Sequence, residues 1–204
     1  MRRVISLLGV VALMLFALGT AGAQDLPCDF LTGGGYIITT QSGSPVHGNF
    51  GVGGSCKQGG NGHGLWGHLE YHDHGTGLNV HWLTVTGYFF CADPECITPS
   101  PVPVPETPLG LPGTRLICGT ARTNQFGDVD WAVRATDSGT SGASDMFAIR
   151  VTKDGLPVYT TEGEPDQTLA GGNIVLHRPN NSTKGPVSTL ATDCRAFCPG
   201  CGID

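Results

Sequence analysis

The sequence contains few charged residues, and few of these are basic. Only 14% of its 204 residues are charged, and 11 Lys and Arg stand against 17 Asp and Glu, a net charge of −6. A nucleic-acid-binding protein is not expected, because neutralising phosphates requires clustered Lys and Arg. Helical periodicity is nearly absent after residue 24, which disfavours a helical fold. No apolar run of membrane-spanning length follows the N-terminal one.

The first 23 residues have the pattern of a secretory signal peptide. Arg2 and Arg3 precede an apolar run over 4–18, and small residues follow up to Ala23. Cleavage after Ala23 leaves nine basic and 17 acidic residues, a net charge of −8. An uncleaved N-terminal anchor is the alternative. Cleavage predicts a protein without a membrane span that is secreted, extracellular or at the cell surface, or periplasmic.

Eight cysteines remain after the predicted cleavage. An even number of cysteines in an exported chain predicts disulfides, although the sequence alone does not determine the pairing. Disulfides offset part of the large backbone entropy that a chain with 32 glycines loses on folding. The candidates are Cys28, Cys56, Cys91, Cys96, Cys118, Cys194, Cys198 and Cys201.

The last three cysteines form a Cys-x3-Cys-x2-Cys tail. This spacing also occurs in zinc knuckles and redox motifs, but both need reduced thiolates, which export disfavours. We therefore expect the tail to be joined to the domain by a disulfide, with Cys28 or Cys56 as the suggested partner.

Nine segments have the alternation and the flanking Gly, Asp, Asn or Pro residues of β-strands. They lie at residues 35–40, 48–53, 67–72, 78–91, 114–123, 129–136, 145–152, 158–161 and 172–178. The pattern predicts an all-β fold, an antiparallel β-sandwich or jelly roll of about nine strands. In the sixth and seventh segments the apolar residues share one face, and a hairpin is expected to join the two. These residues are Val129, Trp131, Val133, Phe147, Ile149 and Val151.

Half of the 14 prolines fall in residues 92–113. Proline fixes φ and lacks an amide donor, so this segment is predicted to be an extended loop insertion, tethered at its start by Cys91 and Cys96. A ligand for a proline-recognition module is the alternative. The predicted organisation is a signal peptide at 1–23, a β-sandwich domain at 24–179 and a cysteine-containing tail at 180–204.

A series of motifs in residues 30–178 resembles one family. The motifs lie at 32–37 (TGGGYI), 48–51 (GNFG), 69–81 (LEYHDHGTGLNVH), 135–139 (ATDSG), 145–150 (DMFAIR) and 171–177 (GGNIVLH). Their order and spacing resemble those of the post-choice-of-anchor domain, a secreted β domain of bacterial surface and extracellular proteins. The resemblance implies an exported all-β domain with no assigned catalytic activity. The cysteines, the proline-rich segment and the tail depart from the family pattern.

The histidines are concentrated in residues 63–81, which hold five of the seven. Imidazoles that converge on one strand face are ligands for Zn, Cu or Fe. The candidate metal ligands are His72, His74, His81 and His177. They partly match a cupin-like metal-dependent enzyme, although the glutamate expected after the His pair is missing. In the other interpretation His72-Asp73-His74 ends a strand, and Asp73 with the histidines hydrogen-bonds the amides of the next turn.

The loop from Asp137 to Asp145 is a candidate calcium site. Its two carboxylates, hydroxyls and exposed carbonyls are the oxygen ligands that Ca²⁺ prefers. A solvated hairpin loop is the alternative. Beyond this calcium site and the transition-metal site, no cofactor is expected.

These patterns favour an exported, non-catalytic structural or adhesive surface module over an enzyme. No Gly-x-Ser-x-Gly motif offers a nucleophile. The predicted partner is an extracellular protein or polysaccharide. A carbohydrate-binding module that uses exposed Trp66, Tyr71 or Trp82 is a further alternative, because aromatic rings stack on apolar ligand faces.

Overall fold

The computed structural model describes residues 29–58, 65–96, 99–100, 109–139, 142–163, 167–179, 194 and 196. The predicted signal peptide, residues 101–108 of the proline-rich segment and most of the tail lie outside this range. In the part of the chain that is described, no helix has the length and apolar character needed to cross a membrane.

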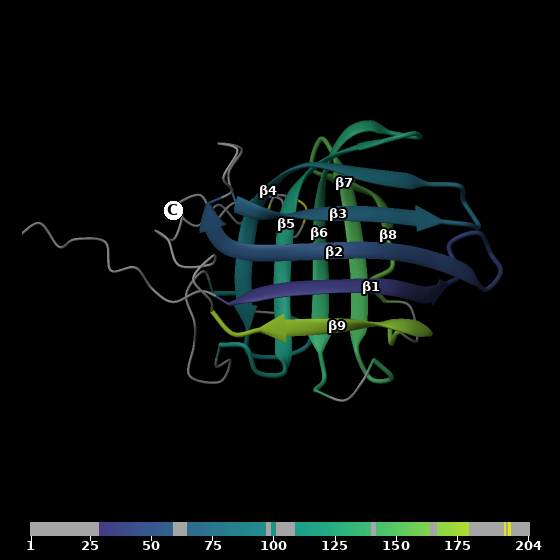
Figure 1. The fold of residues 1–204 in the computed structure, drawn as a ribbon. Coiled ribbons are helices and arrows are strands. Elements are labelled where there is room, and N and C mark those ends of the chain that lie inside the picture. The colour runs from purple at the N-terminus through teal and green to yellow at the C-terminus, as the bar shows by residue number, and fades with distance from the viewer. Residues whose placement is uncertain are drawn as a thin grey trace, which may run out of the picture.

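The described residues form nine β-strands in one sheet and no helix (Figure 1). The strands are β1 (Phe30–Thr39), β2 (Val46–Gln58), β3 (Leu65–Asp73), β4 (Asn79–Cys91), β5 (Gly113–Thr123), β6 (Gly127–Asp137), β7 (Met146–Lys153), β8 (Leu156–Thr160) and β9 (Gly171–His177). Neighbouring strands are antiparallel, in the order β8-β7-β6-β5-β4-β3-β2-β1-β9. The predicted all-β antiparallel fold is confirmed, and each strand overlaps a predicted one.

The sheet folds over at β4, so that its two halves face each other. In Figure 1, β9, β1, β2 and β3 form one layer, and β5, β6 and β7 run crosswise behind it. β3 and β4 share only three residue pairs, at 79–81, whereas β4 pairs with β5 from Val80 to Cys91, with register shifts in residues 82–87. Such irregularities bend and twist a strand, which lets β4 pass from one layer to the other. Both layers therefore belong to one continuous sheet, in which β1 to β8 follow a meander and the β8–β9 connection crosses to the opposite edge beside β1.

The hydrophobic core lies between the two layers. Phe50 of β2 stacks on Phe147 of β7, with ring centroids 3.9 Å apart and an interplanar angle of 10°. Trp131 of β6 is fully buried, and its indole N–H donates to the Thr120 carbonyl at 3.0 Å. The alternation predicted for β6 and β7 is confirmed, because the apolar residues assigned to one face all belong to this core.

A buried ion pair connects the start of β1 to β4 and β5. Arg115 Nη2 lies 2.6 Å from Asp29 Oδ2, and both side chains are fully buried. The Tyr88 hydroxyl donates to Asp29 Oδ1 at 2.7 Å, and the Gly110 N–H donates to Oδ2 at 3.0 Å. Burial, and next the Asp29 charge, raise the pKa of Tyr88 well above its usual range. The buried carboxylate is thus fully partnered, as a charge inside a protein requires.

Two carboxylates of the β6–β7 connection hold the edge strand β9. Asp145 is fully buried, and its Oδ2 accepts the Ile174 N–H at 2.7 Å. Its Oδ1 accepts the N–H and the hydroxyl of Ser138, each at 3.0 Å. Asp137 Oδ2 accepts the Leu176 N–H at 2.8 Å. The predicted hairpin is confirmed, but its loop is not simply solvated, because its carboxylates pair with edge-strand amides that have no strand neighbour.

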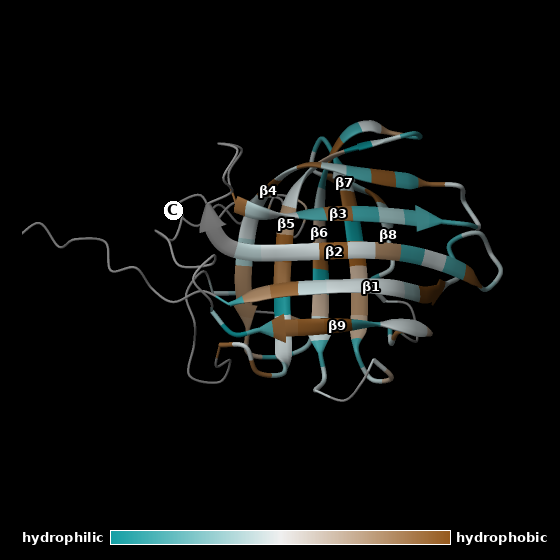
Figure 2. Cartoon of the chain, in the orientation of Figure 1, coloured by the Kyte–Doolittle hydropathy of each residue, from teal (hydrophilic) through white to brown (hydrophobic). Residues whose placement is uncertain are grey.

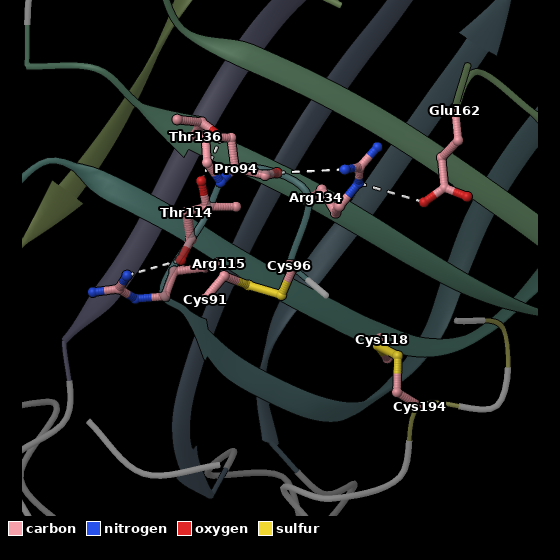
Figure 3. Close-up of a disulfide and its surroundings, with 10 residues drawn as sticks. All are labelled: Cys91, Pro94, Cys96, Thr114, Arg115, Cys118, Arg134, Thr136, Glu162 and Cys194. Atoms are coloured by element: carbon pink, nitrogen blue, oxygen red, sulfur yellow. Dashed lines mark hydrogen bonds and ion pairs between the residues drawn. A yellow bond between two sulfur atoms is a disulfide. The ribbon is translucent and has the colours of Figure 1, made fainter. Parts of the chain in front are cut away.

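A disulfide tethers the start of the proline-rich segment, as predicted. Cys91 bonds to Cys96 (Figure 3). Ser100 then pairs with Phe90 in a single antiparallel bridge. The segment is therefore not wholly free of sheet pairing, because one of its non-proline residues reaches β4. Its last residue, Gly113, is the first residue of β5.

A second disulfide joins the tail to β5. Cys194 bonds to Cys118, which differs from the suggested partners Cys28 and Cys56 (Figure 3). Ala196 is fully buried beside this bond, in a second apolar cluster on the sheet face opposite the core. Disulfides are typical of a non-reducing compartment. Cys28, Cys198 and Cys201 lie outside the described residues, and only the backbone of Cys56 is described.

Candidate functional site

A shallow groove of about 500 Å³ lies on the outer face of β1 to β4. Two rows of residues cross the strands there, each built from direct strand partners. One row is Tyr36, Asn49, His72 and Asn79. The other is Gly51, Glu70 and His81, and it continues to Gly34 of β1 beside the groove. The groove is therefore assembled by sheet register from four strands.

Glycines form the floor of the groove. A Cβ atom added to Gly51, which lines the groove, would meet nothing within 4 Å. One added to its β1 partner Gly34, beside the groove, would meet only the Phe50 carbonyl oxygen at 3.6 Å. The floor is flat because glycine, which has no side chain, occupies outward-facing strand positions there. No neighbouring side chain fills the space above Gly51. Figure 2 shows the hydrophilic end of β3 beside a part of β2 in which hydrophobic, neutral and hydrophilic residues alternate.

Two side-chain pairs form the polar wall over β3 and β4. His72 Nδ1 lies 2.6 Å from Asn79 Oδ1, and His81 Nδ1 lies 2.5 Å from Glu70 Oε1. On β2, the Asn49 side chain is exposed, and its strand partner on β3 is His72. The wall thus presents amide, imidazole and carboxylate groups, which together donate and accept hydrogen bonds.

Tyr36 forms the opposite end of the groove. Its ring stacks on His47, with centroids 4.4 Å apart and an interplanar angle of 28°. The ring also lies over Gly171 of β9, where an added Cβ atom would come within 2.5 Å of it. Glycine at position 171 therefore leaves room for the ring, and two contacts fix its orientation.

The turn between β3 and β4 is held from below. Asp73 Oδ1 accepts the N–H groups of Gly75 and Thr76 at 2.7 and 3.0 Å, which confirms its predicted turn role. Its Oδ2 accepts the hydroxyl of Tyr159 on β8 at 2.6 Å, and that hydroxyl lies 2.7 Å from the Tyr71 hydroxyl. Burial raises the pKa of Tyr159 well above its usual range. The groove wall is thereby linked to the other end of the sheet.

Two of the four metal-ligand candidates lie together. The rings of His72 and His74 have centroids 4.3 Å apart, and His81 pairs with Glu70 in the groove wall. Within the described ranges, no group of three or more His, Cys, Asp or Glu residues is arranged to hold a metal ion. The cupin-like enzyme stays a hypothesis that the described geometry does not favour.

His177 lies apart from the other metal-ligand candidates. It is the strand partner of Phe30, and its ring stacks on the Phe30 ring with centroids 4.5 Å apart. Its Nε2 lies 2.8 Å from the Thr32 hydroxyl oxygen. Phe30 and Tyr36 are six residues apart on β1, so His177 lies about 20 Å from the row that contains His72.

The calcium candidates have structural partners. Asp137 and Asp145 accept hydrogen bonds from β9 amides, as described above. Asp137 Oδ1 also accepts the N–H of Gly139 at 2.7 Å. The calcium site stays a prediction, and the observed contacts give both carboxylates a role in fixing β9.

The aromatic candidates do not form an exposed platform. Tyr71 is 3% exposed, so its prediction as an exposed residue is wrong, because its position on β3 faces the core. Trp82 is partly buried against the core. Trp66 is also partly buried, and it packs edge-on to Phe30 with centroids 6.1 Å apart. Burial lowers the pKa of the neighbouring His68, against an opposing effect of the Glu70 charge.

The remaining groove side chains were not predicted as site residues. They are Tyr36, Asn49, Glu70 and Asn79. Strand alternation assigns Asn49 and Glu70 to the face opposite Phe50 and Tyr71, so the sequence carries a signal for their exposure. It carries no comparable signal for their adjacency, which follows from the pairing of four strands.

No protein-family model matches the sequence, and neither a curated protein nor a solved structure matches it. The resemblance to the post-choice-of-anchor domain therefore stays a prediction. The functional assignment depends on the geometry of the groove.

Proposed function

We propose that the protein is an exported, non-catalytic adhesive module that attaches to extracellular material through the groove from Tyr36 to Asn79. The observation that carries this proposal is the construction of the groove, which combines a glycine floor with polar walls on a sheet. The disulfides and the N-terminal signal pattern support export. Binding groups on a sheet are held more firmly than groups on loops.

The exposure of the groove favours binding over catalysis. Enzymes commonly exclude water from the reacting groups and position an activated nucleophile or base. The Glu70 and His81 side chains are 55% and 65% exposed, so this pair lies in water. No Ser, Thr, Cys or Lys is present among the described lining residues. These features suit reversible attachment.

Retention on extracellular material tests the proposal. The exported protein is mixed with washed cells of the source organism and with their extracellular matrix, and the sedimenting fraction is measured. Gly51→Trp fills the groove floor, where an added side chain meets open space. Leu83→Trp is the matched control, because Leu83 is 41% exposed and lines a separate depression beside Ala121.

We expect the wild type and Leu83→Trp to sediment with the material and Gly51→Trp to stay in solution. Equal retention of all three proteins would locate attachment elsewhere and reject the groove. Absence of wild-type retention would reject the adhesive function.

A further inference from the structure

We infer that the groove binds an uncharged polysaccharide through a short run of its sugar residues. This inference rests on the proposed function and names the ligand of the same site. It follows from the charge of the lining, from the position of the groove in the sheet and from the chemistry of the walls.

The charge of the lining excludes strongly charged ligands. No Lys or Arg is found among the described groove residues, whereas phosphate, sulfate and carboxylate ligands are typically held by such side chains. The lining carboxylate, Glu70, is already paired with His81. A cation would need several converging carboxylates. An uncharged ligand is left.

The position of the groove disfavours a peptide ligand. Strand addition requires an open sheet edge, but β1, β2 and β3 each have a strand on both sides. Helical and proline-rich peptides need apolar or aromatic pockets for their anchors. The apolar groove neighbours Phe50, Tyr71 and Val80 face the core and are 7%, 3% and 1% exposed.

The walls match the hydroxyl groups of sugars. Each sugar hydroxyl donates and accepts, and the amides of Asn49 and Asn79 offer both functions in a planar group. His72 and Glu70 add further ring-nitrogen and carboxylate partners. The row from Tyr36 to Asn79 crosses three strand spacings, about 14 Å, which is longer than one sugar ring. A linear chain therefore fits better than a monosaccharide.

Affinity electrophoresis of the exported, oxidised protein tests the inference. The probes are three neutral polysaccharides, a β-1,3-glucan, a β-1,4-xylan and an α-mannan, with alginate as the anionic comparison. We expect at least one neutral polymer to retard the wild type and Leu83→Trp, and alginate to retard neither. Asn49→Ala should weaken this binding about five- to tenfold, the effect of losing one or two hydrogen bonds. Gly51→Trp should abolish it.

Failure of all three neutral polymers to retard the wild type would overturn the inference. Retardation that is unchanged in both Asn49→Ala and Gly51→Trp would do the same. The proposed function is tested separately. If cells and matrix retain the wild type but not Gly51→Trp, while no neutral polymer retards the wild type, then attachment through the groove stands and the ligand class is wrong.

Discussion

Tyr88 and Tyr159 each donate a buried hydrogen bond to a carboxylate, and both have raised pKa values. In the unfolded chain a tyrosine loses its proton near pH 10. Above that pH the unfolded state binds fewer protons than the folded state, so the free energy of unfolding falls. Their stabilising contribution is therefore fully present below about pH 10 and is lost as the pH rises further.

Alkaline unfolding experiments test this linkage. For each tyrosine we expect the free energy of unfolding to fall by about 1.4 kcal/mol per pH unit above about pH 10. Tyr88→Phe and Tyr159→Phe should each reduce the slope by one such contribution, in urea unfolding measured from about pH 9 to 11.5. A wild-type stability that stays constant over this range would contradict the argument.

At the scale of single elements, β9 depends on the loop between β6 and β7. We expect Asp145→Ala to destabilise the protein by about 1.5–3 kcal/mol, because a charged hydrogen-bond acceptor is removed and buried donors lose their partner. Amide hydrogen exchange should accelerate at Ile174 and remain slow at Ile117 in the middle of β5. Equal acceleration at both positions would show global destabilisation instead of local release of β9.

The strands were predictable from the sequence because alternation and turn residues mark them locally. The start of β1 was not, because the predicted strand began at Gly35, whereas β1 begins at Phe30 and includes Gly33 and Gly34. The structure pairs all three glycines on both sides. A Cβ atom at Gly33 would lie 2.7 Å from Ile174 Cγ1, so the small residue permits close approach of β9.

The groove was predictable only in part. Alternation predicts that Asn49 faces outward, and the histidine-rich segment marked His72 as a candidate ligand. That these residues are neighbours depends on the register between β2 and β3, and Tyr36 joins them through the β1–β2 register. Register is a property of pairing between segments. For the same reason the sequence-based prediction placed His177 in one ligand set with His72, His74 and His81, although His177 lies far from them along the sheet.

At the scale of the whole molecule, the two described disulfides close loops of very different length. Cys118–Cys194 spans 76 residues, whereas Cys91–Cys96 spans five. In the chain-entropy account, the long loop contributes about 4.5 kcal/mol and the short loop about 2 kcal/mol. We expect the paired variant Cys118→Ala, Cys194→Ala to lose more stability in urea than Cys91→Ala, Cys96→Ala. A larger loss for the short loop would point to packing as the main contribution.

β9 is the last strand along the chain, yet it pairs with β1, the first strand. When the chain is synthesised from its N-terminus, β1 to β8 and all of their neighbours among these eight strands are made before β9. One edge of β1 stays unpaired until residues 171–177 have been made. The disulfide of Cys118 can form only later, once Cys194 has been made. The strand that completes the sheet is therefore the last of the nine along the chain.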